Sequence, residues 1–248
     1  MTRIAIIGHG AMGRELVQLA SPLGMTVTEI FDLTRPVTTA DRDTFDVAID
    51  FSWPDAVVEN VRAVTALGRP IVIGTTGWYG RMDDVERLIE SGQTGCVWGS
   101  NFNIGTHLFL RVVRRAAELI DPHTAFDIAI HEWHHHRKKD SPSGTALSTA
   151  QNVLAALPRK THVESEAQHE RIDPSALHVT STRVGEVVGR HQVTIDSPYE
   201  SIEITHTAKN RQGFAQGALL AASWIEHRKG FYDVSSLIDS LTQEREAP

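Results

Sequence analysis

The chain has 248 residues, of which 41% are hydrophobic and 22% are charged. This length predicts one large domain or two modest ones, and the composition excludes disordered, collagen-like and coiled-coil proteins. The net charge of −7 provides no basic surplus, so we expect neither nucleic acid nor a membrane as a partner. The single cysteine, Cys96, cannot form an intrachain disulfide, and no apolar run approaches membrane-spanning length, which predicts a cytoplasmic protein.

Strands alternate with helices along the first hundred residues. Short apolar segments predict strands at residues 3–7, 25–31, 47–51, 70–73 and 95–98. Apolar residues at helical spacing lie between several of these strands, and Gly24 and Gly68 are suited to end two of the helices. Such alternation is typical of βαβ units in a parallel sheet.

After residue 105 the pattern changes. A helix is predicted at 106–120, with Leu108, Val112, Ala116 and Leu119 on one face. Strands follow from residue 126 and near 177–182, 191–196 and 200–207, a long loop is expected at 157–175, and two helices are expected near 213–227 and 233–243.

These patterns together predict an α/β protein of two domains. The first is a Rossmann-like parallel-sheet domain that includes residues 1–105. The second begins at residue 106 and is a smaller α+β domain with a mixed or antiparallel sheet.

A glycine motif, Gly8-x-Gly10-x-x-Gly13, lies between the first strand and the first helix. In that position the first glycine makes a tight turn, the second lets the backbone approach a pyrophosphate, and the third lets helix pack on strand. The start of the helix then offers N–H groups to phosphates. The alternative is a glycine-rich turn without a ligand.

Asp32 favours the dinucleotide-binding interpretation, because it lies at a strand end about 20 residues beyond the motif, where a ribose 2′-hydroxyl acceptor belongs. A carboxylate at this place repels a 2′-phosphate and therefore favours NADH over NADPH. Arg35 can offset that repulsion, so the use of NADPH stays open.

His131, Glu132 and His135 match the H-E-x-x-H pattern of zinc proteases. That pattern binds zinc only on a helix, where positions i and i+4 share a face. Here it continues a period-2 strand, in which residues 131 and 135 would lie about 13 Å apart. We therefore expect no metal, and a solvated histidine run is the other alternative.

Histidines and lysines lie just before Ser143-Gly144-Thr145-Ala146, where a new helix is predicted to begin. Cations beside a helix N-terminus indicate a carboxylate or phosphate ligand. His134 and Lys138 are four residues apart and can converge on one substrate. Either group can supply the proton that accompanies hydride delivery.

Residues 132–146 resemble the signature E-x-H-H-x-x-K-x-D-x-P-S-G-T-A of the dihydrodipicolinate reductase family, with every fixed position filled. Further stretches resemble the same family: residues 47–52 with Pro54, residues 72–77, Asn101-Phe102, Arg183 with Gly189 and His191, and residues 203–206 leading to Arg211 and Phe214. The glycine turn is one residue shorter than in many members of the family.

The resemblance implies reduction of 4-hydroxy-tetrahydrodipicolinate with NADH or NADPH, in lysine and diaminopimelate biosynthesis. It places the cofactor on Gly8, Gly10, Met12, Gly13 and Asp32, with Gly74, Thr76, Ser100, Asn101 and Phe102 on the nicotinamide side. It makes His134 the general acid and Lys138 the second catalytic group, and it assigns the dicarboxylate substrate to His135, Lys138, Gly144 and Thr145. It also implies that the chain returns to the first domain near Arg211 and Phe214, so that the dinucleotide-binding domain is 1–105 with 212–248 and the substrate-binding and oligomerisation domain is 106–211. The family further implies a homotetramer paired through the sheet of the second domain.

Two other functions remain as alternatives. One is a different two-domain Rossmann oxidoreductase that acts on a sugar or an amino-acid semialdehyde, and the other is a metal-binding or non-catalytic nucleotide sensor. The doubled lysine also leaves open whether Lys138 or Lys139 points inward, although position favours Lys138.

Overall fold

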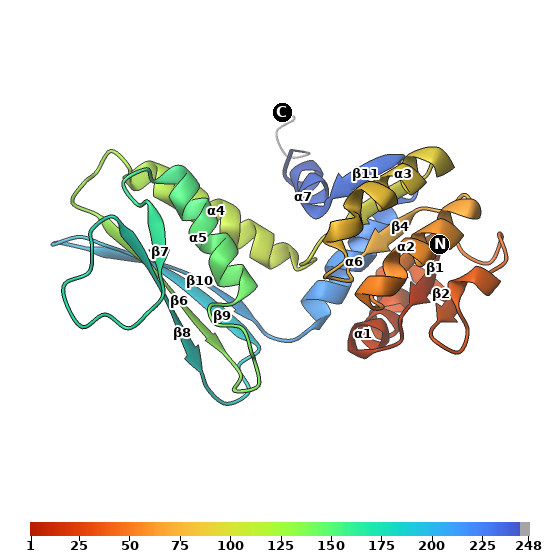
Figure 1. The fold of residues 1–248 in the computed structure, drawn as a ribbon, viewed down its shortest axis with the longest axis horizontal. Helices are drawn as coiled ribbons and strands as arrows, with labels where there is room; N and C mark the ends of the chain where they lie inside the picture. The colour runs from red at the N-terminus through yellow and green to blue at the C-terminus, as the bar shows by residue number, and fades with distance from the viewer. Residues whose placement is uncertain (244–248) are drawn as a thin grey trace. The chain divides into compact units, whose positions relative to one another are not determined.

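The computed structural model describes residues 1–243, and these form two compact units (Figure 1). The first unit contains residues 1–104 and the chain from residue 211 onward, and the second contains residues 105–210. Residues 244–248 of the expected first domain lie outside the described residues. Among the described residues, no helix combines the length and the apolar character needed to cross a membrane.

A six-stranded sheet with strand order β11-β5-β4-β3-β1-β2 forms the centre of the first unit, and all its pairs are parallel. Its strands are β1 (Thr2–Ile7), β2 (Met25–Phe31), β3 (Val47–Asp50), β4 (Ile71–Ile73), β5 (Gly95–Trp98) and β11 (Gly230–Asp233). The predicted parallel sheet is thus confirmed. Strand β11 was not predicted, because its aromatic residues follow a long helix and pair with β5 only in the folded chain.

Helices cover both faces of this sheet, as continuous apolar strands require. They are α1 (Ala11–Ala20), α2 (Val57–Ala66), α3 (Met82–Gly92), α6 (Gln212–Ile225) and α7 (Val234–Gln243). Successive residues of β1 enter different cores: Ile4 and Ile6 pack with α1 and α6, whereas Ala5 and Ile7 pack with α2 and α3. The strand period of two therefore builds two cores around one sheet.

The second unit has a mixed sheet, as the sequence predicted, and its five strands have the order β10-β9-β6-β8-β7. Its strands are β6 (Asp127–His134), β7 (His162–Glu164), β8 (Ala176–Arg183), β9 (Gly189–Asp196) and β10 (Ser201–Ala208). Strand β8 runs parallel to β6 and β7, whereas β6, β9 and β10 are antiparallel neighbours. Helices α4 (Ile104–Ile120) and α5 (Gly144–Ala156) pack on one face of the sheet (Figure 1).

The expected loop at 157–175 is wrong in part, because it contains strand β7 at the edge of the sheet. A buried lysine anchors this segment: Lys160 is 4% exposed, and its Nζ donates to the carbonyls of Pro174 and Ala176 at 2.9 Å each. Its ammonium also pairs with Asp127 Oδ1 at 2.7 Å. These partners lie far away in sequence, so the local polar pattern does not reveal the strand.

The apolar face expected for α4 is not its buried face. Leu108, Val112 and Leu119 are 44%, 53% and 57% exposed. The buried side consists of Thr106, Phe109, Val113, Ala117 and Ile120. This helix carries two apolar stripes, and packing against the sheet, rather than periodicity, decides which one enters the core.

Gly217 allows α6 to approach the chain before α4, since a Cβ at this position would lie 1.7 Å from the Phe102 carbonyl oxygen. We expect Gly217→Ala to destabilise the fold by roughly 1–3 kcal/mol, because a backbone atom must move. Gly80→Ala is the matched control, since no atom lies within 4 Å of the place that its Cβ would take, and it should change stability by less than about 0.5 kcal/mol. Urea unfolding of both variants measures the difference, and equal midpoints would refute the close approach.

Candidate active site

The glycine turn is shaped partly by packing and partly by an open approach to helix α1. Gly8 has φ +93°, and a Cβ on it would lie 2.3 Å from the Phe51 carbonyl oxygen; a Cβ on Gly13 would lie 2.2 Å from the Gly8 oxygen. Gly10 begins the helix as its N-cap, with no atom within 4 Å of a Cβ position and no side-chain cap on the helix. The uncapped N–H groups beside Gly10 fit a phosphate.

Asp32 lies next to this turn, and its Oδ1 is held by its own loop. The oxygen accepts hydrogen bonds from Thr34 Oγ1 at 2.7 Å, Thr34 N at 2.8 Å and Arg35 N at 3.1 Å. These bonds lower the pKa of the Asp32 carboxyl, so it is ionised. Asp32, Gly8, Ser52 and Asn60 line one cavity of about 210 Å³.

The Arg35 guanidinium is directed toward its own strand. Its Nη2 pairs with Glu29 Oε2 at 2.6 Å, and the group lies 5.0 Å from the centre of the Phe31 ring. Glu29 therefore neutralises the one cation that the sequence offered to a 2′-phosphate.

A buried carboxylate, Asp50, joins the ends of strands β3 and β4. It accepts hydrogen bonds from Ser52 N (2.8 Å), Ser52 Oγ (2.6 Å), Thr75 Oγ1 (2.8 Å) and Asn60 Nδ2 (2.9 Å). Burial raises the pKa of Asp50, and these hydrogen bonds offset only part of that rise. Sequence reasoning gave this residue no role, although a lone Asp that ends an apolar strand was an available signal.

The five positions expected on the nicotinamide side differ in exposure. Thr76 and Ser100 are exposed, and Asn101 is half-buried, with its Oδ1 accepting from Asn103 N at 2.8 Å. Gly74 packs against the Phe51 ring. Phe102 is only 2% exposed and meets the Phe51 ring edge-on, so its side chain belongs to the core.

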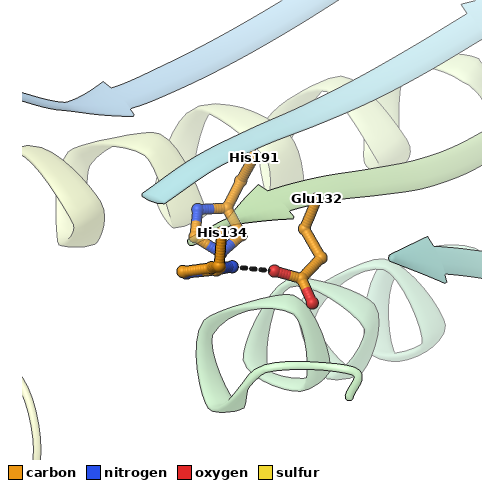
Figure 2. A group of neighbouring side chains, drawn as sticks. All are labelled: Glu132, His134 and His191. Carbon is orange, nitrogen blue, oxygen red and sulfur yellow. Dashed lines mark ion pairs between the residues drawn. The ribbon is translucent and has the colours of Figure 1, made fainter. Parts of the chain in front are cut away.

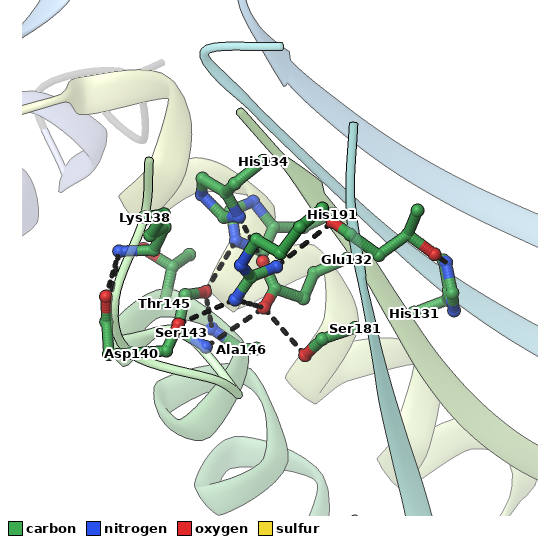
Figure 3. Close-up of polar contacts among 12 residues, drawn as sticks. His131, Glu132, His134, Lys138, Asp140, Ser143, Thr145, Ala146, Ser181 and His191 are labelled. Carbon is green, nitrogen blue, oxygen red and sulfur yellow. Dashed lines mark hydrogen bonds and ion pairs between the residues drawn. The ribbon is translucent and has the colours of Figure 1, made fainter. Parts of the chain in front are cut away.

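The polar centre of the second unit is Glu132, a fully buried carboxylate on β6 (Figure 3). Its Oε1 accepts from Ser181 Oγ and Arg183 Nη2 at 2.8 Å each and from Ser143 N at 3.1 Å. Its Oε2 pairs with Nδ1 of His134. Burial raises the pKa of Glu132, but the bonds from His134, Arg183 and Ser181 outweigh it and hold the pKa well below its usual range.

This ion pair orients His134, which is two residues further along the same strand and 7% exposed. A carboxylate on Nδ1 fixes the orientation of the ring, and Nε2 is left as the nitrogen for proton exchange. The ring of His191 lies 5.2 Å from that of His134, centre to centre. His191 Nε2 is 3.2 Å from Ser143 Oγ, and burial is the main cause that lowers the His191 pKa to about 4.

Helix α5 begins beside this group, and a carboxylate already lies at its first turn. Ser143 caps the helix by accepting from Ala146 N at 3.2 Å, while Gly144 is exposed. Asp140 pairs with Lys138 Nζ at 2.7 Å, and the Lys138 ammonium and the Gly144 backbone lower the pKa of Asp140. The start of this helix, together with Lys138, is thus a place that accepts a carboxylate.

The other basic residues of the segment face elsewhere. Arg137 forms two hydrogen bonds with Glu186, of 2.7 and 2.6 Å, and His136 and Lys139 are exposed. His135 is half-buried, and burial and the nearby Arg137 lower its pKa. Of the two adjacent lysines, Lys138 is the one that lies at the helix start.

The H-E-x-x-H residues are not on a helix. His131 and Glu132 belong to strand β6, and His135 follows its end. His131 makes its hydrogen bonds to Thr180 and Thr182 of β8. Alternation along the strand therefore separates His131 from Glu132 and His134.

Two family models match this chain in adjacent blocks. Residues 2–102 match the model described as dihydrodipicolinate reductase, N-terminus, and residues 105–238 match the model described as dihydrodipicolinate reductase, C-terminus. Together these ranges cover both units.

Similar proteins carry a consistent name. The 4-hydroxy-tetrahydrodipicolinate reductase of Christiangramia forsetii is 32% identical over 240 residues, which cover 96% of this chain and 98% of the relative. The enzyme of the same name from Blochmanniella pennsylvanica is 37% identical over 210 residues, covering 81% and 73%. A dipicolinate-bound dihydrodipicolinate reductase from Paenisporosarcina sp. TG-14 has the same fold, with a TM-score of 0.75, 24% identity and coverage of 94% and 97%.

The buried His191 predicts a loss of stability in weak acid. Because its pKa falls from 6.5 to about 4 on folding, the unfolded chain takes up a proton first as the pH falls. This residue alone should lower the free energy of unfolding by about 2 kcal/mol between pH 7 and pH 5. In His191→Gln that part of the loss should vanish, as measured by urea unfolding at both pH values. A variant with the wild-type pH dependence would contradict the prediction.

Proposed function

Since this chain belongs to the dihydrodipicolinate reductase family, we propose that it reduces 4-hydroxy-tetrahydrodipicolinate to tetrahydrodipicolinate with NAD(P)H. The observation that carries this proposal is the buried Glu132–His134 pair next to a helix start that holds a carboxylate together with Lys138. A dicarboxylate substrate matches that chemistry. A sugar or semialdehyde substrate is not favoured, because the curated relatives bear the reductase name over most of the chain.

The dinucleotide would be held by the first unit. We assign its phosphates to the open turn at Gly8, Gly10, Met12 and Gly13, and its adenosine ribose to Asp32. The nicotinamide side is assigned to Gly74, Thr76, Ser100, Asn101 and Phe102, with Phe102 contributing backbone atoms because its side chain is buried. When bound, the cofactor supplies the hydride.

We propose NADH as the preferred cofactor. Asp32 is ionised and repels a 2′-phosphate. Arg35, the cation that would attract this phosphate, is paired with Glu29. NADPH is used as well if Arg35 breaks its ion pair with Glu29 and turns to the 2′-phosphate.

The substrate would bind to the second unit through its carboxylates. In the proposed complex a substrate carboxylate takes the place of the Asp140 carboxylate at the Gly144 N–H, within reach of the Thr145 hydroxyl. Lys138 exchanges one carboxylate partner for another, and His135 contacts the second acid group. An anion at this position is stabilised by the helix dipole as well as by the lysine.

His134 would act as the general acid. Glu132 holds Nδ1 and so fixes the orientation of the ring, and a proton at Nε2 can then pass to the substrate as hydride arrives. Lys138 stabilises the negative charge that develops on the conjugated system. Arg183 and Ser181 keep Glu132 from rotating, since both bind the oxygen that does not contact His134.

We further propose a homotetramer assembled through the second unit. Helices α4 and α5 cover one face of its sheet, and the opposite face carries the half-buried Trp133 under Arg190, 4.7 Å from the ring centre. Sedimentation of the purified protein measures the mass of the assembly. The cytoplasmic location stays a prediction.

The reaction is tested by following oxidation of NADH and NADPH in a coupled assay. A second enzyme, the synthase that makes 4-hydroxy-tetrahydrodipicolinate, produces the substrate in situ from pyruvate and aspartate semialdehyde. We expect turnover with either cofactor and inhibition by pyridine-2,6-dicarboxylate. Absence of turnover, with NADH binding retained in fluorescence titrations, would exclude this substrate while leaving the dinucleotide assignment intact.

The catalytic assignment predicts that His134→Gln and Lys138→Ala each lower kcat by roughly 100-fold or more, the usual scale for loss of an acid or base. Lys139→Ala is the matched control, because Lys139 is exposed, and it should retain near-normal kcat. Steady-state kinetics with purified variants provide the measurement. Normal turnover in both His134 and Lys138 variants would overturn the assignment.

The cofactor assignment predicts opposite effects for two substitutions beside the ribose site. Asp32→Ala should weaken the binding of NADH more than that of NADPH, because the ribose of NADH loses its hydrogen-bond acceptor while the repulsion of the 2′-phosphate of NADPH disappears. Glu29→Gln should strengthen the binding of NADPH without weakening that of NADH, because the substitution releases Arg35 for the 2′-phosphate. Dissociation constants from fluorescence titration decide the matter, and equal effects on both cofactors would remove these residues from the ribose site.

A further inference from the structure

We propose that Glu132, His134 and His191 form a binding site for a zinc-type divalent cation, and that this cation inhibits the enzyme by taking the place of the proton between Glu132 and His134. The three side chains lie together on one face of the second unit's sheet (Figure 2). Each is buried, and each can direct one ligand atom to a common point, with the three atoms within 4.8 Å of one another.

The sheet register creates this arrangement. Glu132 and His134 are two residues apart on β6, so their side chains point to the same face. His191 lies directly opposite Glu132 on the antiparallel strand β9. Two nitrogens and one carboxylate oxygen are a ligand set that zinc accepts in open sites, where water occupies a fourth position.

The carboxylate is already prepared as a ligand. All three hydrogen bonds from Ser143, Ser181 and Arg183 go to Oε1, which leaves Oε2 directed at His134. Metal-binding carboxylates are commonly held in this way by donors on their second oxygen. Arg183 therefore serves as a hydrogen-bond partner of the ligand and approaches it from the side of Oε1.

His191 reaches the same carboxylate from the neighbouring strand. It is 4% exposed, and its Nε2 lies 3.2 Å from Ser143 Oγ. Because Ser143 N donates to Glu132 Oε1, this nitrogen of His191 lies on the side of the carboxylate. An imidazole nitrogen is a common zinc ligand.

This trio differs from the metal pattern that the sequence contains and from a second pair of possible ligands on the surface. The H-E-x-x-H pattern pairs His131 with His135, which strand geometry separates. The exposed His136 and the Glu186 carboxylate, 4.0 Å apart, are the competing surface site. Neither includes His191, so this residue distinguishes the proposed site from both.

A bound cation would stop catalysis, because with a metal in place of the proton on Nδ1, donation of the Nε2 proton of His134 would leave an imidazolate instead of a neutral ring. Binding of the metal rests on the geometry alone, whereas inhibition rests on the function proposed above. The two parts are therefore measured separately.

Binding is tested with Zn²⁺ alone, by calorimetric titration of the full chain without substrate or cofactor, and by the visible spectrum of Co²⁺. We expect one metal per chain and the strong absorption of tetrahedral or five-coordinate cobalt. His191→Gln and His134→Gln should each weaken binding by more than the roughly 10–100-fold that loss of an outer-shell partner costs. His136→Gln, the matched control on the surface, should bind as the parent chain does. Circular dichroism melting of each variant establishes that it is folded.

Two binding results would overturn the proposal: no stoichiometric binding to the parent chain, or binding that is lost in His136→Gln and kept in the other two variants. The two ligand variants alter different strands, so failure of one to fold leaves the other to decide.

Inhibition is tested by adding Zn²⁺ to the reductase assay, with recovery after excess chelator as the expected result. Turnover that persists while the trio holds zinc would overturn the inhibitory part. Turnover without zinc, measured in the same assay, reports separately on the proposed function. Pyridine-2,6-dicarboxylate is omitted from this experiment because it chelates zinc itself.

Discussion

The second unit is organised around one buried negative charge. Burying an ionised carboxylate costs several kcal/mol unless hydrogen bonds and a cation compensate for it. Glu132 obtains that compensation from the start of α5 through Ser143, from β8 through Ser181 and Arg183, and from its own strand through His134. The requirement to satisfy this one group therefore sets the relative positions of a helix and two strands, and it delivers an oriented histidine next to the helix N-terminus.

In the first unit, close approach between backbone atoms holds the glycine turn in place. Gly8 and Gly13 touch backbone carbonyls that any side chain would displace, whereas Gly10 faces open space. The turn is thus rigid at two glycines and open at one. Asp50, buried and satisfied by Ser52, Asn60 and Thr75, fixes the neighbouring strand ends. Rigid supports of this kind allow a site to be held in place before its ligands arrive.

The cations of this acidic protein are mostly paired with carboxylates of the same chain. Arg35 is paired with Glu29, Arg137 with Glu186, and Lys138 with Asp140. Such pairs make a weak contribution to stability when they are exposed. In the proposed complexes, a charged ligand that binds Arg35 or Lys138 has to displace the carboxylate that already occupies its place. Selectivity for cofactor and substrate can therefore depend on residues that never touch either.

Local sequence was enough to predict the alternating strands and helices of the first unit, the glycine turn with Asp32, and the signature segment that carries His134, Lys138 and Gly144. It was enough because strand period, turn chemistry and helix starts depend on residues within a few positions. The strand β7 within an expected loop, the buried face of α4, the extra strand β11 and the partners of Glu132 emerged only in the folded chain. Folding also brought His191 opposite Glu132, 59 residues along the chain. Each of these depends on register between distant strands or on competition between two apolar faces for one core, and local sequence holds no measure of either.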